Sequence, residues 1–149
     1  MQKKTLIQVT GSQRYPDGSE DKMDFVTVGQ LHIRQGNFYI LYKESEVTGM
    51  AGVTTSLRVE KDKVVLNRMG AVDLKQIFEP GVLNSSTYVT AFGSLYLSVF
   101  TEHMEINLTD QGGSITLKYN LFADDELVSH NTLTMIIKED PPRCTYMKG

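Results

Sequence analysis

The sequence predicts an all-β fold, and within that class an antiparallel up-and-down β-barrel of about eight to ten strands. Short segments in which apolar and polar residues alternate recur at the spacing of roughly 8 to 12 residues that is typical of sandwiches and barrels. Turn-forming residues separate these segments, and no long amphipathic helix interrupts them. Because a closed meander leaves no unpaired strand edge, the pattern favours a barrel over an open sheet.

The chain of 149 residues is long enough to bury a hydrophobic core without disulfides or a structural metal. We expect one β-barrel domain over residues 1–140 and a loose tail over residues 141–149, which begins with Pro141 and Pro142. Cys144 is the single cysteine, so no internal disulfide can form. That usage, with no signal peptide and no membrane-spanning run, predicts a cytoplasmic protein.

In the first half of the chain, five segments alternate as strands do. They cover residues 4–11, 23–35, 38–44, 53–60 and 64–70. Pro16-Asp17-Gly18 is a turn, because Pro fixes φ and Gly supplies a positive φ, and Gln35-Gly36-Asn37 is a hairpin turn. Gly29 lies within a predicted strand, which indicates a bulge or a sharp bend at a barrel corner.

In the second half, the predicted strands are shorter and one segment is ambiguous. Strands are expected over residues 72–78, 88–92, 95–101, 104–109, 115–122 and 133–137. Residues 73–79 could instead form a short helix, because they are poor in β-branched residues. Turns are expected at Pro80-Gly81, at Gln111-Gly112-Gly113 and over residues 124–126.

Several motifs, taken in order, are similar to those of an uncharacterised bacterial family typified by the YwiB protein. They are Asn67-Arg68-Met69-Gly70, Tyr88-Val89-Thr90-Ala91-Phe92-Gly93, Thr101 and the hairpin segment from Gly113 to Tyr119, with residues 42–45 upstream. The resemblance covers nearly the whole chain and implies a calycin-like barrel, related in shape to lipocalins and fatty-acid-binding proteins. It implies no reaction, since one fold hosts many functions.

The sequence contains no motif for binding a metal, a nucleotide or a nucleic acid. There is no His-Glu-x-x-His pair, no paired cysteine and no phosphate loop, since the Gly49–Gly52 segment lacks a following Lys and a helix. We therefore expect no cofactor and no metal. The net charge of −3 is spread along the chain without a basic stripe, so neither nucleic acid nor a membrane is an expected partner. The three histidines, His32, His103 and His130, are expected at the surface.

What remains is a set of polar residues that strand parity places on the inward face. Its members are Thr27, Tyr42, Glu44, Thr55, Arg68, Tyr88, Thr90, Thr101 and Tyr119. Glu44 shares a face with Ile40, and Arg68 with Leu66, so each charge sits on the apolar side of its strand. Because an unpaired buried charge is costly, we expect Glu44 and Arg68 to pair directly or through one bound molecule.

Three functions fit these residues. The first is a non-catalytic barrel that binds a small amphipathic or anionic molecule, with Tyr42, Glu44, Arg68, Tyr88, Thr90 and Tyr119 as the expected ligand-binding residues. The second is a lyase or isomerase that uses Glu44 or a tyrosine as acid or base beside Arg68. The third is a solid barrel that acts as a protein-interaction module. The sequence does not predict the oligomeric state.

Overall fold

A computed structural model describes residues 2–44 and 51–139 of the chain. The tail expected over residues 141–149, including Cys144, lies outside the described residues. Gly49 and Met50 of the Gly49–Gly52 segment lie outside them as well. No helix among the described residues is long and apolar enough to cross a membrane.

The described residues form ten antiparallel strands in a single sheet. The strands are β1 (Gln2–Arg14), β2 (Glu20–Arg34), β3 (Asn37–Lys43), β4 (Val53–Val59), β5 (Val64–Gly70), β6 (Leu74–Phe78), β7 (Leu83–Thr90), β8 (Gly93–Thr109), β9 (Gly112–Ala123) and β10 (Glu126–Glu139). The predicted all-β class and the up-and-down barrel are therefore confirmed, and residues 73–79 contain a strand rather than a helix.

The barrel is closed by pairing of the first strand, β1, with the last, β10, and it is interrupted between β6 and β7. Its order is β6-β5-β4-β3-β2-β1-β10-β9-β8-β7, so β1 pairs with both β2 and β10. The two ends of this order, β6 and β7, meet at an isolated bridge in which Asp73 and Val89 exchange two backbone hydrogen bonds of 2.9 Å. Asn84 Nδ2 also donates to the Ile77 carbonyl oxygen, at 3.1 Å. We call this junction the β6–β7 seam.

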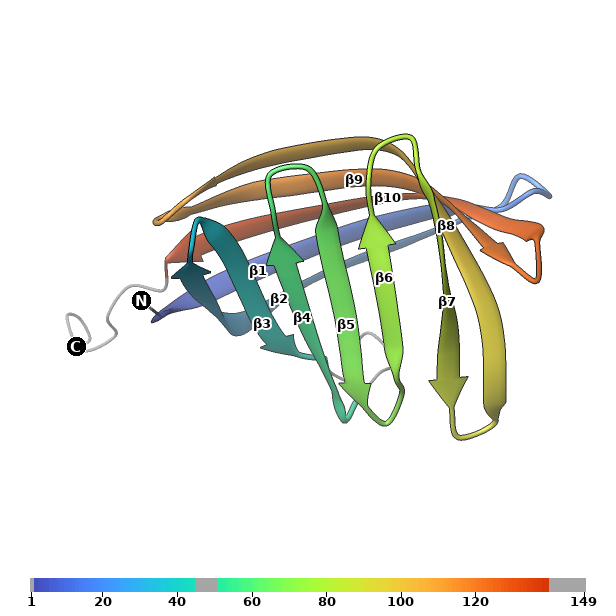
Figure 1. Cartoon of the computed structure of the whole chain (residues 1–149), viewed down its shortest axis with the longest axis horizontal. Helices are drawn as coiled ribbons and strands as arrows, with labels where there is room; N and C mark the ends of the chain where they lie inside the picture. Colours follow the sequence, from blue (N-terminus) through green and yellow to red (C-terminus); the bar gives the residue numbers. More distant parts are fainter. Residues whose placement is uncertain (1, 45–50, 140–149) are drawn as a thin grey trace.

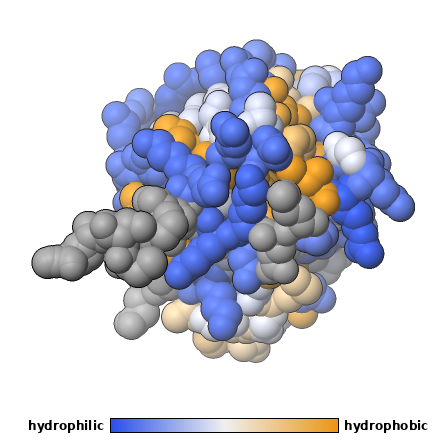
Figure 2. Space-filling model, turned by 90° about the vertical axis from the view of Figure 1, so that its left-hand side faces the viewer, coloured by the Kyte–Doolittle hydropathy of each residue, from blue (hydrophilic) through white to orange (hydrophobic). Residues whose placement is uncertain are grey.

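The long strands and the short strands lie on opposite sides of the barrel. In Figure 1, β1, β2, β9 and β10 run lengthwise, and the short strands β3 to β6 cross them at a steep angle. The β7–β8 hairpin stands beside β6. Figure 2 views the end of the barrel near the two termini, where hydrophilic side chains cover most of the surface and hydrophobic ones show between them.

The core follows the alternation that the sequence displays. Fully buried side chains come from both sides of the barrel and include Ile7, Leu31, Ile40, Leu57, Phe78, Leu117 and Ile137. Burial of this apolar surface is the main source of stability, because each strand contributes every second residue to the same interior.

Two hairpin turns have the backbone geometry that suits twisted antiparallel strands. Gln35 and Gly36 join β2 to β3 with φ of 52° and 82°, and Asp124 and Asp125 join β9 to β10 with φ of 49° and 69°. Positive φ at both central residues is the mark of a type I′ turn. The predicted turn at Gln35-Gly36-Asn37 is confirmed, whereas Gly112 and Gly113 belong to β9 and only Asp110 and Gln111 turn.

One further expectation about the strands was wrong, and of the two alternatives at Gly29 the bulge is not formed. The strands expected over residues 95–101 and 104–109 are one strand, β8, in which the register shifts between Thr101 and His103. A bulge there lets the inward parity change without ending the strand. Gly29 lies in unbroken register with Thr5 and Tyr42, so it forms no bulge. Its role is in packing.

Candidate functional site

A row of four side chains crosses the short strands at the site. The register places Tyr42 of β3 beside Thr55 of β4, Thr55 beside Arg68 of β5, and Arg68 beside Leu74 of β6. Gly29 opposes Tyr42 on the other side, and a Cβ there would lie 3.1 Å from the Tyr42 Cβ and 2.5 Å from the Leu41 carbonyl oxygen. The missing side chain therefore gives Tyr42 its space in the interior.

Glu44 lies directly after β3 and is buried at the end of this row. Its backbone N–H donates to the Val53 carbonyl oxygen at 2.8 Å, which continues the strand ladder beyond β3. The Thr55 hydroxyl donates to Glu44 Oε2, and Arg68 Nε lies 3.8 Å from the same oxygen. The predicted pairing of Glu44 with Arg68 is thus present, as an ion pair without a direct hydrogen bond.

The pair is unequal in burial and incompletely satisfied. The Glu44 side chain is 1% exposed and the Arg68 side chain 24% exposed. Glu44 Oε1 and Arg68 Nε are both buried, and neither has a hydrogen-bond partner among the described residues. Such groups are rare in folded proteins, because an unsatisfied buried polar atom costs free energy, so they single out this position.

Two tyrosines flank Arg68. Burial raises the pKa of Tyr42 well above its ordinary value, the Glu44 carboxylate raises it further, and the Arg68 guanidinium partly opposes both. Burial also raises the pKa of Tyr119, and Arg68 again opposes the shift. The Tyr119 ring packs edge-on against Phe78 with ring centres 4.9 Å apart. Both phenols are therefore neutral hydrogen-bond donors at pH 7.

A cavity of about 320 Å³ adjoins Arg68 and reaches the surface beside the exposed residues Asp21 and Lys22. Its polar lining includes Arg68, Gln76, Tyr119 and Asn131, and its apolar lining includes Met23, Leu66 and Leu133. The cavity lies between the β1–β2 side of the barrel and β5–β6. Glu44 is not among its lining residues. Arg68 therefore stands between the buried carboxylate and the open space.

The structure does not bring all of the expected ligand-binding residues together. Tyr42, Glu44, Arg68 and Tyr119 cluster, but only Arg68 and Tyr119 line the cavity. Tyr88 and Thr90 belong to β7 and do not line it. The Thr90 hydroxyl accepts from the Phe92 N–H and donates to the Gly93 carbonyl oxygen, each at 3.1 Å. The Thr90 hydroxyl is therefore engaged in the β7–β8 turn, away from the cavity lining.

Two polar residues of the cavity were missed. Gln76 is 8% exposed and Asn131 is 5% exposed. Gln76 shares the parity of Leu74 and Phe78, and that alternation could have identified it. Asn131 lies two residues before Leu133, on the same inward face. An extension of the predicted strand by two residues would have found it.

Only one of the three histidines is fully at the surface. His103 is exposed, whereas His32 and His130 are half-buried. The His130 Nδ1 lies 2.5 Å from Asn120 Oδ1. Within residues 2–44 and 51–139, no group of three or more His, Cys, Asp or Glu side chains is arranged to hold a metal ion.

Comparisons with known proteins point to one family. The model of a domain of unknown function, DUF1934, matches residues 7–135. The uncharacterised β-barrel protein YwiB of Bacillus subtilis (strain 168) is 29% identical over 119 residues, which are 80% of this chain and 82% of YwiB. The resemblance inferred from the motifs is thereby confirmed.

A solved structure has the same fold. The crystal structure of the ywiB protein from Bacillus subtilis superposes with a TM-score of 0.84 and covers 94% of each chain at 23% sequence identity. This likeness establishes the nearly closed ten-stranded barrel.

Proposed function

This chain belongs to the DUF1934 family of domains of unknown function, and we propose that it binds a small amphipathic or anionic molecule inside the barrel without catalysing a reaction on it. The position of Arg68 carries the proposal. Its side chain lines the cavity, while the carboxylate beside it is buried and accepts a hydrogen bond from Thr55.

The Arg68 guanidinium has hydrogen-bond donors that the protein does not use. A guanidinium carries five N–H donors, and Arg68 makes no hydrogen bond to any described residue. Glu44 balances its charge from 3.8 Å away without occupying those donors. A planar carboxylate or another oxyanion in the cavity could take two of the donors at once, which is the geometry that guanidinium recognises best.

The cavity wall fits an amphipathic ligand. Met23, Leu66 and Leu133 offer apolar contacts, and Gln76 and Tyr119 offer a few polar groups near Arg68. Polar side chains outnumber apolar ones in the wall, so it suits a ligand that has polar groups beside its apolar part. A volume of about 320 Å³ is at the small end of the range for small-molecule sites. This cavity favours a hollow barrel over the solid interaction module.

The same geometry favours binding over catalysis. Glu44 does not line the cavity, so it is poorly placed to exchange a proton with a bound molecule. Tyr42 and Tyr119 have raised pKa values, so they hold their protons at pH 7 and cannot act as bases there. The lyase or isomerase alternative relied on Glu44 or a tyrosine as the base, and neither is suited to that role at this cavity.

The test compares octanoate with octanol, which share a chain and differ in charge. Isothermal titration calorimetry should show that the wild-type protein prefers octanoate. Glu44→Gln with Arg68→Gln removes both charges, and it should weaken octanoate binding by about tenfold or more while octanol binding changes by less than about twofold. Native mass spectrometry should also show any copurified molecule on the wild type and not on the double variant.

The matched control is Arg58→Gln on β4. Arg58 is a half-buried arginine that pairs with Glu60 at 2.8 Å, outside the cavity. Its loss should leave octanoate binding unchanged. Equal octanoate affinity in the folded double variant and the wild type would overturn the proposed function.

A further inference from the structure

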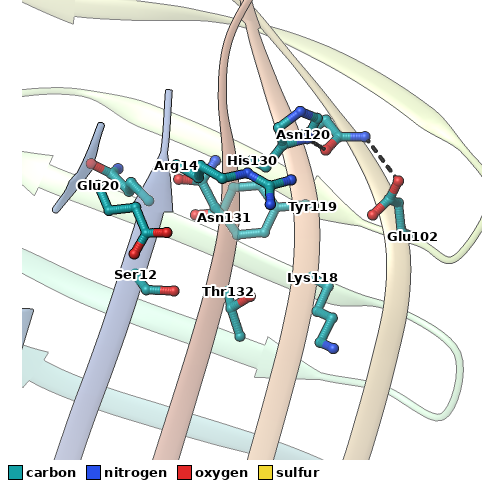
Figure 3. A pocket seen from close by; sticks show the side chains of 11 residues that line it. Ser12, Arg14, Glu20, Glu102, Lys118, Tyr119, Asn120, His130, Asn131 and Thr132 are labelled. Carbon is teal, nitrogen blue, oxygen red and sulfur yellow. Dashed lines mark hydrogen bonds between the residues drawn. The ribbon is translucent and has the colours of Figure 1, made fainter. Parts of the chain in front are cut away.

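A second depression, of about 370 Å³, lies on the outer face of the long strands. Its lining shares five residues with the cavity beside Arg68, namely Ser12, Gln13, Tyr119, Asn131 and Thr132, but Arg14, Lys118 and His130 line this depression alone. Two rows of side chains cross it, because the register aligns residues of β1, β10 and β9. One row contains Arg14, His130 and Asn120, and the other contains Ser12, Thr132 and Lys118. Figure 3 shows these side chains gathered around the depression.

His130 is held in one orientation by a hydrogen-bonded chain. Asn120 Nδ2 donates to Glu102 Oε2 at 3.2 Å, which turns the Asn120 amide oxygen toward His130 Nδ1 (Figure 3). An amide oxygen only accepts hydrogen bonds, so His130 Nδ1 carries the hydrogen. Nε2 on the opposite side of the ring makes no hydrogen bond to any described residue.

Glu102 owes its place in this chain to the β8 bulge. The register shifts between Thr101 and His103, and Glu102 is the residue left over on the outer face. Bulges of this kind often re-aim a side chain at a functional position. The irregularity that misled the sequence-based strand boundaries therefore supplies the acceptor that orients Asn120.

Two cationic side chains at the depression have no partner within the described part of the chain. The side chains of Arg14 and Lys118 make no hydrogen bond or ion pair with any residue in 2–44 or 51–139. Glu20 is the register partner of Arg14 on β2, and no ion pair joins the two side chains. Strands lie about 4.8 Å apart, so β1 and β9 are about 10 Å apart across β10. The long side chains of Arg14 and Lys118 can therefore reach one anion from two sides.

We propose that this outer depression binds the phosphoryl group of a small metabolite. A tetrahedral oxyanion accepts hydrogen bonds from several directions, and here donors come from three strands: Arg14 on β1, Lys118 on β9, and the hydroxyls of Ser12 and Thr132 between them. His130 lies in the same lining, so its ring senses an anion bound there. The depression exceeds the size of one phosphate, which leaves room for an organic remainder.

Anion binding at this depression would depend on its own side chains and not on the net charge of the protein. The chain carries a net charge of −3, so the whole protein repels anions and only a local group of cations can retain one. Glu102 is already engaged with Asn120. Glu20 lies at the edge of the depression and can accept a hydrogen bond from a hydroxyl of the remainder.

The experiment follows the His130 ring by NMR during titration with inorganic phosphate and with glycerol 3-phosphate. Both should shift the His130 signals saturably, and glycerol 3-phosphate should bind more tightly. Arg14→Gln with Lys118→Gln should weaken both by about tenfold or more, and the single variant Lys118→Gln should show an intermediate loss. Lys61→Gln, a lysine in the exposed β4–β5 turn, is the matched control and should bind as the wild type does.

Three results would overturn the proposal. They are a His130 shift that sodium chloride reproduces at equal ionic strength, equal phosphate affinity in the double variant, and tighter binding of a short oligonucleotide than of glycerol 3-phosphate. Ser12, Arg14 and Lys118 do not belong to the hydrophobic core, so melting curves should confirm that the variants are folded.

Discussion

Arg68 Nε lies 3.8 Å from Glu44 Oε2, in contact range for charge but beyond a hydrogen bond. The carboxylate is almost fully buried, and the guanidinium reaches the edge of the cavity. Loss of Arg68 should therefore cost more stability than loss of Glu44, because it leaves a buried charge without a counter-charge, whereas Arg68 can be solvated.

Arg68→Met should destabilise the protein by about 3 kcal/mol, because it leaves the Glu44 carboxylate buried and without its counter-charge. We choose the lower end of the usual range because Arg68 is partly exposed. Adding Glu44→Leu should recover most of the loss. Urea unfolding of the two variants measures both values, and a single variant as stable as the wild type would show that the pair has no structural role.

Alkaline pH should destabilise the fold through Tyr42 and Tyr119. Their folded-state pKa values are raised above the ordinary 10.0, so the folded protein holds these protons more tightly than the unfolded chain. This contribution to stability is fully present below pH 10 and is lost as the pH rises through the folded-state values. Ultraviolet titration at rising pH should show two tyrosines that ionise only on unfolding, and one in Tyr42→Phe. Full ionisation of every tyrosine in the folded wild type would contradict this.

Gly29→Ala should destabilise the barrel by about 1–3 kcal/mol, since a methyl group at this position overlaps its surroundings. The new Cβ would lie 2.5 Å from the Ile7 Cδ1 and 2.5 Å from the Leu41 carbonyl oxygen. The matched control is Gly11→Ala in β1, where the nearest atom is Met23 Cε at 3.8 Å. Thermal melting should therefore separate the two glycines, and equal melting temperatures would refute the packing role.

Asn84→Ala should loosen the β6–β7 seam. The side chain donates to the Ile77 carbonyl oxygen at 3.1 Å and lies 3.4 Å from Glu79 Oε1, and β6 and β7 lack a regular ladder there. We expect a loss of about 1 kcal/mol, typical of one hydrogen bond. Amide hydrogen exchange should accelerate in β6 and β7 and stay unchanged in β1 and β10. Uniform acceleration throughout the sheet would show that the seam does not open separately.

Local alternation was sufficient to predict most of the strands, the barrel and the inward position of Glu44 and Arg68. It failed where a position depends on register between strands. Thr90 has inward parity, but its hydroxyl bonds within a turn that only the paired hairpin defines. His130 and Asn120 meet because two strands align them, and Glu102 joins them because of a bulge. None of these relationships has a spacing signal in one sequence.

The pairing of β1 with β10 places a constraint on the order of folding. Ten residue pairs join these strands, which lie at opposite ends of the described chain. During synthesis on the ribosome, β1 to β6 can form an open sheet, but β1 keeps a free edge until β10 has emerged. Such distant contacts slow folding, so we expect the amides of β1 that face β10 to become protected last in pulsed hydrogen exchange. In a circular permutant whose original ends are linked and whose new ends lie between β6 and β7, β10 and β1 would be consecutive in the chain. Their pairing would then be local, so this permutant should fold faster.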